Sequence, residues 1–300
     1  MRDFMSKVAV ITGAGSGMGR YLAVLLAKSG CNVVICDVNE ETLAGTASML
    51  KNYNVAVSSH LLDVGDEAAI KALPEKVIEQ HGKVDLVFNN AGITIDSDFA
   101  NMPEPDWDKV MDVNLHGVIN MTRAFLPHLK NRPEAAVVNT SSIFGMIAVP
   151  RQSVYHATKF AVRGFTESLV KEMKGTSVQV HCVHPGHIGT NILTAAKVNP
   201  SKDGSEQPNL LGRADATHEE QGQAFRENGM HASRAAEVIL NGVRKRRSRI
   251  FIGMDAKLID LAQRFTPMHY DKLLPLIFLP LVLFRNKKAI RDLPAEPLQE

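Results

Sequence analysis

A buried strand, a glycine-rich turn and an amphipathic helix follow one another without interruption near the start of the chain. Val8–Thr12 is a continuous run of apolar and β-branched residues, as in a strand buried on both faces. Residues 13–19 contain four glycines, and residues 21–28 have the spacing of an amphipathic helix that Gly30 ends. Such a unit can hold a pyrophosphate, because bare glycine backbone lets phosphates approach and the helix N-terminus offers unpaired N–H groups.

The spacing of the glycines indicates which type of phosphate-binding turn this is. Gly13, Gly17 and Gly19 follow Thr12 in the pattern Thr-Gly-x-x-x-Gly-x-Gly, not in the pattern Gly-x-Gly-x-x-Gly. No Gly-Lys-Ser/Thr follows, which argues against a P-loop. The alternative is a flexible turn that binds nothing, but the flanking strand and helix favour phosphate binding.

Strand and helix patterns alternate along the rest of the chain. This alternation predicts parallel strands joined by right-handed helical crossovers. We therefore predict an α/β fold, a doubly wound parallel seven-stranded sheet with helices on both faces, as one domain over residues 1–300 with a core at about 6–255. The later strands are expected at residues 32–36, 55–61, 84–88, 135–140, 178–183 and 249–253, and the main later helices at 66–81, 106–130 and 233–245.

Charge and cysteine content exclude several classes of function. The formal net charge of +2 implies no bulk attraction to nucleic acid. The 3 cysteines are too few and too irregularly spaced for a disulfide framework or a zinc cluster, and they suit a reducing compartment. The first residues lead almost directly into a strand, so no signal peptide is expected, and no apolar run reaches spanning length. The sequence thus predicts a cytoplasmic protein.

Three histidines, His181, His184 and His187, lie close together around the end of a predicted strand. Their side chains should diverge along the strand and around Pro185, and no carboxylate stands at ligand spacing. We therefore expect no metal site. The histidines are predicted to line the core or the site, and His187 is a candidate for contact with cofactor or substrate.

Asp37 ends the second predicted strand and bears on the identity of the dinucleotide. A carboxylate at this place can accept both hydroxyls of an adenosine ribose, and it repels a 2′-phosphate. Ser16 and Val38 supply no cation for such a phosphate. The prediction is therefore NAD in preference to NADP. The alternative is that Asp37 only caps the helix that starts near Glu40.

Tyr155 and Lys159 stand four apart in a predicted helix and so share one of its faces. A nearby ammonium favours the phenolate and lowers the pKa of a tyrosine, which makes the pair a candidate general acid/base for interconverting an alcohol and a carbonyl. Ser142, thirteen residues before Tyr155 at a strand end, can bring a hydroxyl opposite it. Asn114 lies inside the helix predicted at 106–130, where it either binds water or a backbone carbonyl in a kink or faces solvent.

In this order, the motifs resemble those of the short-chain dehydrogenase/reductase family, in its single-domain alcohol/ketone branch. The resemblance covers about residues 6–255. The matching segments are Thr12-Gly13-x-x-x-Gly17-x-Gly19, Asn89-Asn90-Ala91-Gly92, Asn114, Ser142, Tyr155-x-x-x-Lys159 and Pro185-Gly186-His187-Ile188-Gly189-Thr190.

The resemblance implies a role for each catalytic candidate. Tyr155 would exchange a proton with the substrate oxygen. Ser142 would hold that oxygen and stabilise the charge that develops on it. Lys159 would lower the pKa of Tyr155 and bind the nicotinamide ribose. Asn114 would hold a water in a proton relay to solvent.

The same resemblance implies a set of cofactor contacts. Asp63 and Val64 would contact the adenine. Asn90 and Gly92 would shape the cofactor site, and Thr190 would bind the nicotinamide carboxamide. Beside Tyr155 and Lys159, the full implied set is Gly13, Ser16, Gly17, Met18, Gly19, Asp37, Asp63, Val64, Asn90, Ala91, Gly92, Pro185, Gly186, Ile188 and Thr190.

The last third of the chain departs from a simple alternation. Residues 191–230 show little periodicity, and in the family that the chain resembles this stretch is a substrate lid. In the extension at 256–300, residues 256–265 are predicted to be helical and residues 273–284 are almost wholly apolar. We expect the apolar run to make a contact, with three alternatives: a subunit interface, a wall of a lipophilic substrate pocket, or a peripheral membrane contact helped by Arg285, Lys287 and Lys288.

The sequence therefore predicts an oxidoreductase that uses NAD and acts on a secondary alcohol or its ketone. The alternative is a catalytically idle, NAD-binding regulatory protein on the same fold. The presence of Ser142 together with Tyr155 favours the enzyme, because a pure binder needs neither. The resemblance further implies a homodimer or homotetramer, formed partly through the helix that carries Tyr155.

Overall fold

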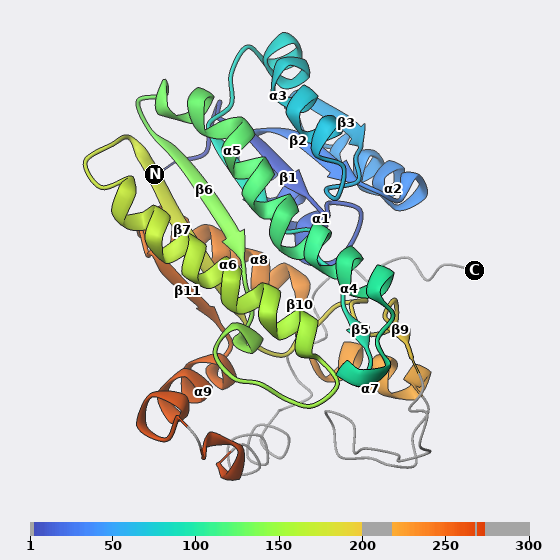
Figure 1. Cartoon of the computed structure of the whole chain (residues 1–300). Coiled ribbons are helices and arrows are strands. Elements are labelled where there is room, and N and C mark those ends of the chain that lie inside the picture. The colour runs from blue at the N-terminus through green and yellow to red at the C-terminus, as the bar shows by residue number, and fades with distance from the viewer. Residues whose placement is uncertain (1–2, 200–217, 268, 274–300) are drawn as a thin grey trace.

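The computed structural model describes residues 3–199, 218–267 and 269–273. Seven parallel strands form the central sheet in the order β11-β7-β6-β4-β1-β2-β3, which confirms the predicted doubly wound sheet (Figure 1). The strand order reverses between β1 and β4, and this is where ligands bind in open α/β sheets. The strands are β1 (Val8–Thr12), β2 (Asn32–Asp37), β3 (Val57–Leu61), β4 (Leu86–Asn89), β6 (Ala135–Thr140), β7 (Val178–Pro185) and β11 (Arg249–Ile252).

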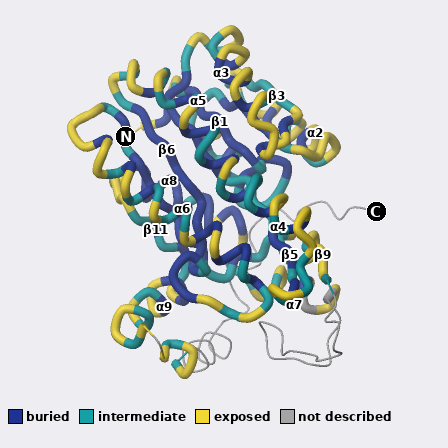
Figure 2. The backbone as a smooth tube through the Cα atoms, viewed as in Figure 1, coloured by how far each residue is buried: buried dark blue, intermediate teal, exposed yellow. Residues whose placement is uncertain are grey.

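Alternate residues of the central strands face two separate layers of helices. Ala9 and Ile11 of β1 pack on one side, and Val8 and Val10 pack on the other. All four are fully buried, and Figure 2 shows the buried central strands between exposed helix surfaces. The first layer is formed by α1 (Gly17–Lys28), α2 (Glu40–Leu50) and α8 (Ala232–Arg244), and the second by α3 (Glu67–His81), α5 (Gly117–Lys130) and α6 (Ser153–Glu172).

The structure at the start of α2 shows whether Asp37 caps this helix. The N-cap of α2 is Asn39, whose side chain accepts the N–H of Thr42 at 2.9 Å. The carboxylate of Asp37 instead accepts the backbone N–H of Gly15 at 2.8 Å and that of Asn39 at 3.0 Å. The interpretation of Asp37 as the helix cap is therefore wrong, and its carboxylate lies against the glycine turn.

The helix predicted at residues 106–130 is interrupted. It consists of α4 (Glu104–Met111), a π-helical turn at Asp112–His116, and α5. A π-helical turn inserts one residue and breaks the regular hydrogen-bond ladder. Asn114 occupies this turn and is fully buried, so the prediction of a kink is confirmed and the solvent-facing alternative is wrong.

The segment after β7 is more regular than its sequence suggested. It contains β8 (Ile188–Gly189), β9 (Lys197–Val198), α7 (His218–Asn228) and β10 (Met230–His231). β9 pairs with β5 (Ile95–Asp96), and β10 pairs with β8, so both ends of the predicted lid are fastened to the body of the protein. Residues 191–230 show little periodicity, but they include β9 and α7.

The predicted C-terminal helix is present as α9 (Met254–Phe265) and is followed by a short 3-10 turn at Tyr270–Lys272. Of the apolar run at 273–284, all but Leu273 lies outside the described residues. Within the described ranges, no helix has both the length and the apolar character needed to cross a membrane.

Candidate active site

The ends of β1 and β4 meet so closely that only glycine fits between them. Gly13 has a φ of +64°, and a Cβ there would lie 2.8 Å from the Cα of Ala91. A Cβ on Gly19 would overlap the carbonyl oxygen of Gly13. Asn90 donates from Nδ2 to the carbonyl oxygens of Thr12, at 3.2 Å, and Gly13, at 3.3 Å. These contacts fix the glycine turn over the point where the strand order reverses.

The turn fits the pyrophosphate of a dinucleotide. The Oδ1 atom of Asn90 is buried and has no hydrogen-bond partner among the described residues. The methyl group of Thr190 lies 3.3 Å from where a Cβ on Gly17 would stand, so the predicted carboxamide-binding residue and the glycine turn face each other. The carboxylate of Asp37 completes this side through its bond to the N–H of Gly15. A bound dinucleotide would satisfy both features, because its ribose hydroxyls can donate to an orphaned acceptor and its phosphate oxygens accept from bare backbone N–H groups.

The two residues predicted to contact the adenine, Asp63 and Val64, make different contacts in the structure. The side chain of Val64 is buried against Gly117, whose Cβ position is 3.1 Å from the Val64 side chain. The carboxylate of Asp63 accepts the N–H of Gly65 at 2.8 Å. Adenine contact by these two residues stays a prediction.

The catalytic candidates meet at the carboxyl end of β6. Tyr155 and Lys159 lie on α6 and are buried, and the Ser142 hydroxyl lies close enough to the phenol of Tyr155 to favour its ionised form. The Oγ atom of Ser142 also accepts the N–H of Phe144 at 3.1 Å. The ammonium of Lys159 donates to the carbonyl oxygen of Thr140 at 3.0 Å and lies 5.5 Å from the centre of the Tyr155 ring. The structure therefore brings together three of the four predicted catalytic residues at one strand end.

Burial favours the neutral form of both groups of the pair. It raises the pKa of Tyr155 to about 12, against the opposing effect of the Ser142 hydrogen bond, and it lowers the pKa of Lys159 to about 8. The predicted net lowering of the Tyr155 pKa is therefore wrong for the protein by itself. The reason is burial of the phenol, and the ammonium does not offset it because it is directed at the carbonyl of Thr140.

Asn114, the fourth candidate, is held by backbone next to the lysine. Its Nδ2 donates to the carbonyl oxygen of Ile93 at 2.9 Å, and its Oδ1 accepts the N–H of the same residue at 2.9 Å. A Cβ on Gly92 would lie 3.3 Å from Asn114 Oδ1 and 3.4 Å from Lys159 Nζ. Asn114 thus ties the π-helical turn to the strand end beside Lys159, and its role in a water relay stays a prediction.

Comparison with known proteins decides the family. The family model described as short chain dehydrogenase matches residues 7–200. The chain belongs to the short-chain dehydrogenase family. Membership makes it an oxidoreductase that acts on CH–OH or carbonyl groups.

Relatives of this dehydrogenase cover most of its length. It is 39% identical over 275 residues to SadH, described as an oxidoreductase of Mycobacterium tuberculosis, covering 91% of this chain and 95% of that one. It is 38% identical over 184 residues to the 3-oxoacyl-[acyl-carrier-protein] reductase FabG of Thermotoga maritima, covering 61% and 75%. A short-chain dehydrogenase/reductase of Burkholderia phymatum, solved in complex with NAD, is 30% identical with a TM-score of 0.74 and 100% coverage of both chains.

Two residues that position the dehydrogenase site were missed in the sequence. The first is His156, whose Nε2 accepts the N–H of Val149 at 2.9 Å and whose Nδ1–H donates to the carbonyl oxygen of Phe144 at 2.9 Å. Burial lowers its pKa and keeps the ring neutral, as these two bonds require. His156 thus fixes the loop between Ser142 and α6. Its place inside Tyr155-x-x-x-Lys159 was the only signal in the sequence.

The second is Asp255 at the start of α9. Its Oδ2 accepts the backbone N–H of His187 at 2.7 Å, and its carboxylate fills the space where Gly186 and Gly253 lack a side chain. Asp255 therefore connects the extension after β11 to the turn that leads to Thr190. No sequence pattern indicates this pairing, because the two segments are 68 residues apart.

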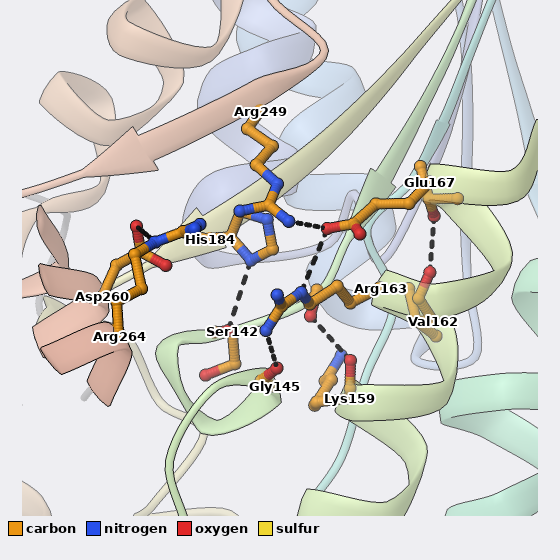
Figure 3. Close-up of polar contacts among 12 residues, drawn as sticks. Ser142, Gly145, Lys159, Val162, Arg163, Glu167, His184, Arg249, Asp260 and Arg264 are labelled. Atoms are coloured by element: carbon orange, nitrogen blue, oxygen red, sulfur yellow. Dashed lines mark hydrogen bonds and ion pairs between the residues drawn. The ribbon is translucent and has the colours of Figure 1, made fainter. Parts of the chain in front are cut away.

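The histidines of β7 are core residues of the dehydrogenase. His181 and His184 are buried, and burial lowers the pKa of each to about 4, so both are neutral at pH 7. His184 donates from Nδ1 to the carbonyl oxygen of Ser142 at 3.4 Å (Figure 3). Its ring stacks on that of Phe251. His187 donates from Nε2 to the carbonyl oxygen of Phe225 at 2.8 Å. In the described part of the chain, no group of three or more His, Cys, Asp or Glu side chains could hold a metal.

A chain of ion pairs links the loop after Ser142 to α6 and β11. Arg163 of α6 donates to the carbonyl oxygen of Gly145 at 3.2 Å and pairs with Glu167 at 3.0 Å (Figure 3). Glu167 also pairs with Arg249 of β11. The loop after Ser142 is thereby held to α6 and β11.

Proposed function

We propose that this protein transfers a hydride between NAD and a secondary alcohol or its ketone. The proximity of Ser142 and Tyr155 at the carboxyl end of β6 supports the proposal most directly, since both hydroxyls would converge on one substrate oxygen. The nicotinamide, when bound, supplies or accepts the hydride. The turn at Gly13, Gly17 and Gly19 would hold the pyrophosphate, and Thr190 the carboxamide.

The proton chemistry follows from the ionisation of Tyr155. Its raised pKa, about 12, keeps the phenol protonated at neutral pH, which suits donation of a proton to a ketone oxygen. Ser142 would donate a hydrogen bond to the same oxygen and stabilise negative charge on it. In the reverse direction Tyr155 would accept the proton of the alcohol.

The preference for NAD over NADP rests on Asp37. Its carboxylate lies at the end of β2, fixed by the N–H groups of Gly15 and Asn39, where it would repel a 2′-phosphate. Arg20 is the cation near this turn, and its guanidinium is hydrogen-bonded to the carbonyl oxygen of Gly15 and to Thr46. The Burkholderia relative solved with NAD supports the same choice.

A panel of alcohols and ketones, from short to lipophilic, tests the proposal through nicotinamide absorbance with both dinucleotides. We expect turnover of at least one secondary alcohol or ketone, with kcat/KM at least about tenfold higher for NAD than for NADP. Absence of turnover across the panel, with NAD still bound, would favour the idle regulatory alternative. Preference for NADP would contradict the role given to Asp37.

The rates of the two directions of the reaction should depend differently on pH. Oxidation needs the deprotonated form of Tyr155, which is the minor form below its pKa of about 12. We therefore expect kcat/KM for the alcohol to rise by about tenfold per pH unit on the acid side, while ketone reduction stays nearly flat between about pH 6 and 8. Initial rates in one mixed buffer measure both. A pH-independent oxidation rate would show that another group takes the proton.

The homodimer or homotetramer stays a prediction, which sedimentation of the purified protein measures. The exposed face of α6 carries Ala157, Phe160 and Gly164 at helical spacing, with Phe160 41% exposed. A second copy covering this face would bury an aromatic ring and two small residues that allow close approach of helices.

A further inference from the structure

The first part of the predicted lid is a described arm, residues 191–199, that ends against β5. β9 of the arm pairs with β5 in parallel register, Ile95 with Lys197 and Asp96 with Val198. The N–H of Asn199 adds a hydrogen bond to the carbonyl oxygen of Asp96 at 2.9 Å. A two-residue pairing of this kind cannot hold a chain segment by itself. Something else must fix the arm.

One arginine joins the arm to β5 and its following loop. Arg151 pairs with Asp96 and, at 2.8 Å, with Asp98. Its Nη2 donates to the carbonyl oxygen of Asn199 in the arm at 2.9 Å. The side chain is only 12% exposed, so these charge-assisted bonds are partly shielded from water. The planar guanidinium reaches these three partners from three separate nitrogens, a spread that the single ammonium nitrogen of a lysine cannot match.

A second ion pair fastens the same arm to α4. Lys197 lies 2.7 Å from one carboxylate oxygen of Asp106 and 2.9 Å from the other, and Asn199 donates from Nδ2 to Asp106 at 3.0 Å. The hydrogen bonds from Lys197 and Asn199 hold the pKa of the Asp106 carboxyl below its usual value. Lys197 is 56% exposed, so this pair is the weaker of the two fastenings.

The place of Arg151 in the chain connects the arm to the chemistry. Arg151 precedes Tyr155 by four residues, and its neighbour Gln152 accepts a buried hydrogen bond from Thr94. The arm itself starts directly after Thr190, which lies against the glycine turn. Figure 1 shows β5, β9, α4 and α7 gathered beyond the carboxyl end of the sheet. One side chain thus links the start of the catalytic helix to the segment that leaves the cofactor site.

The backbone of Arg151 has a strained conformation, and its side-chain bonds stabilise the arginine there. Its φ is +63°, in the left-handed region that favours glycine. A glycine at this position would relieve the strain but make none of the three bonds. An arginine held in this conformation by its side-chain contacts is a candidate for a residue whose contacts serve a function.

We propose that Arg151 is a positioning residue that holds the lid arm in one place relative to Tyr155 and Thr190. The proposal rests on the proposed function for its kinetic consequence only, since the holding itself does not require turnover. Without Arg151, the arm at 197–199 would detach from β5 and sample other positions. Substrate would then meet a site whose lid is not in register with the catalytic helix.

The variant Arg151→Gly tests whether Arg151 holds the arm in place without being needed for the stability of the whole protein. The variant removes the three bonds and also relieves the backbone strain, so its melting temperature should not fall below that of the control Arg264→Met. The control removes a surface arginine whose 2.9 Å pair with Asp260 lies on α9, away from the arm (Figure 3). We expect amide exchange at residues 95–98 and 197–199 to accelerate by about tenfold or more in Arg151→Gly, with exchange in β1, β4 and β6 unchanged.

The kinetic readout is a split between KM and kcat. We expect KM for the substrate to rise about tenfold in Arg151→Gly, with kcat falling less, and Arg151→Lys to recover only part of the loss. Unchanged exchange at 197–199, or acceleration spread evenly over the sheet, would overturn the proposal. Faster exchange confined to the arm, together with an unchanged KM in an active Arg151→Gly enzyme, would also overturn the proposal. If the wild type turns over no alcohol or ketone, the proposed function fails, and the exchange experiment still decides whether Arg151 holds the arm.

Discussion

Tyr155→Phe is expected to lower kcat by about 10²–10⁴-fold while leaving the dissociation constant for NAD within about threefold of the wild type. The substitution removes one oxygen atom, the group that would exchange a proton with the substrate. It keeps the ring that packs edge-on against Phe144, with ring centres 6.2 Å apart. Steady-state rates and a fluorescence titration with NAD measure the two quantities.

Tyr53→Phe is the matched control. Tyr53 is a half-buried ring at the edge of the core, and it lies outside the proposed site. Its loss of a hydroxyl should leave both kcat and NAD affinity unchanged. Equal turnover by Tyr155→Phe and the wild type would remove Tyr155 from the mechanism. If neither protein turns over any substrate and both bind NAD, the idle regulatory alternative would be the better account.

The parts of the fold that follow from local pattern could be predicted from the sequence. Each of the seven strands lies within two residues of its predicted bounds. The central strands β1 and β2 were the easiest to predict, because a parallel strand buried on both faces has a nearly unbroken apolar sequence. The glycine turn was equally readable, since Gly13 and Gly19 are required by close backbone approach. Asp37 was predicted at the end of the second strand, and the structure places its carboxylate against the glycine turn.

The direction of the Tyr155 pKa could not be predicted in the same way. Helical spacing places Lys159 on the same face as Tyr155, but it does not say where the ammonium points. In the structure the ammonium donates to the carbonyl oxygen of Thr140, and burial raises the pKa of the phenol. Desolvation depends on everything packed around a group, so it is a property of the fold rather than of a motif.

The residues that position the site escaped prediction for a related reason. Asp255 contacts a turn 68 positions away, and Arg151 contacts Asn199 across 48. Neither residue belongs to a motif, and acidic or basic side chains usually indicate solvated surface. The π-helical turn at Asn114 is similar, because the backbone of Ile93 that stabilises it comes from a different loop. Only the folded chain brings these partners together.

Gly19→Ala is expected to abolish measurable NAD binding and to destabilise the protein by about 2 kcal/mol or more. A methyl group at this position would overlap the carbonyl oxygen of Gly13 and lie 2.8 Å from Asn90 Nδ2. The overlapping atom belongs to the backbone of the turn, so it cannot rotate away as a flexible side chain could. The turn would have to open, and the proposed pyrophosphate site would open with it.

Gly45→Ala provides the comparison for this effect. Gly45 lies in the middle of α2 and is exposed, and the nearest atom to its Cβ position is 4.0 Å away on Arg20. The same added methyl should there stabilise the helix by about 0.5–1 kcal/mol and leave NAD affinity unchanged. Urea denaturation and a fluorescence titration with NAD measure both variants. Normal NAD affinity in Gly19→Ala would mean that the dinucleotide is held away from the glycine turn, because no binding mode that uses this backbone leaves room for the methyl.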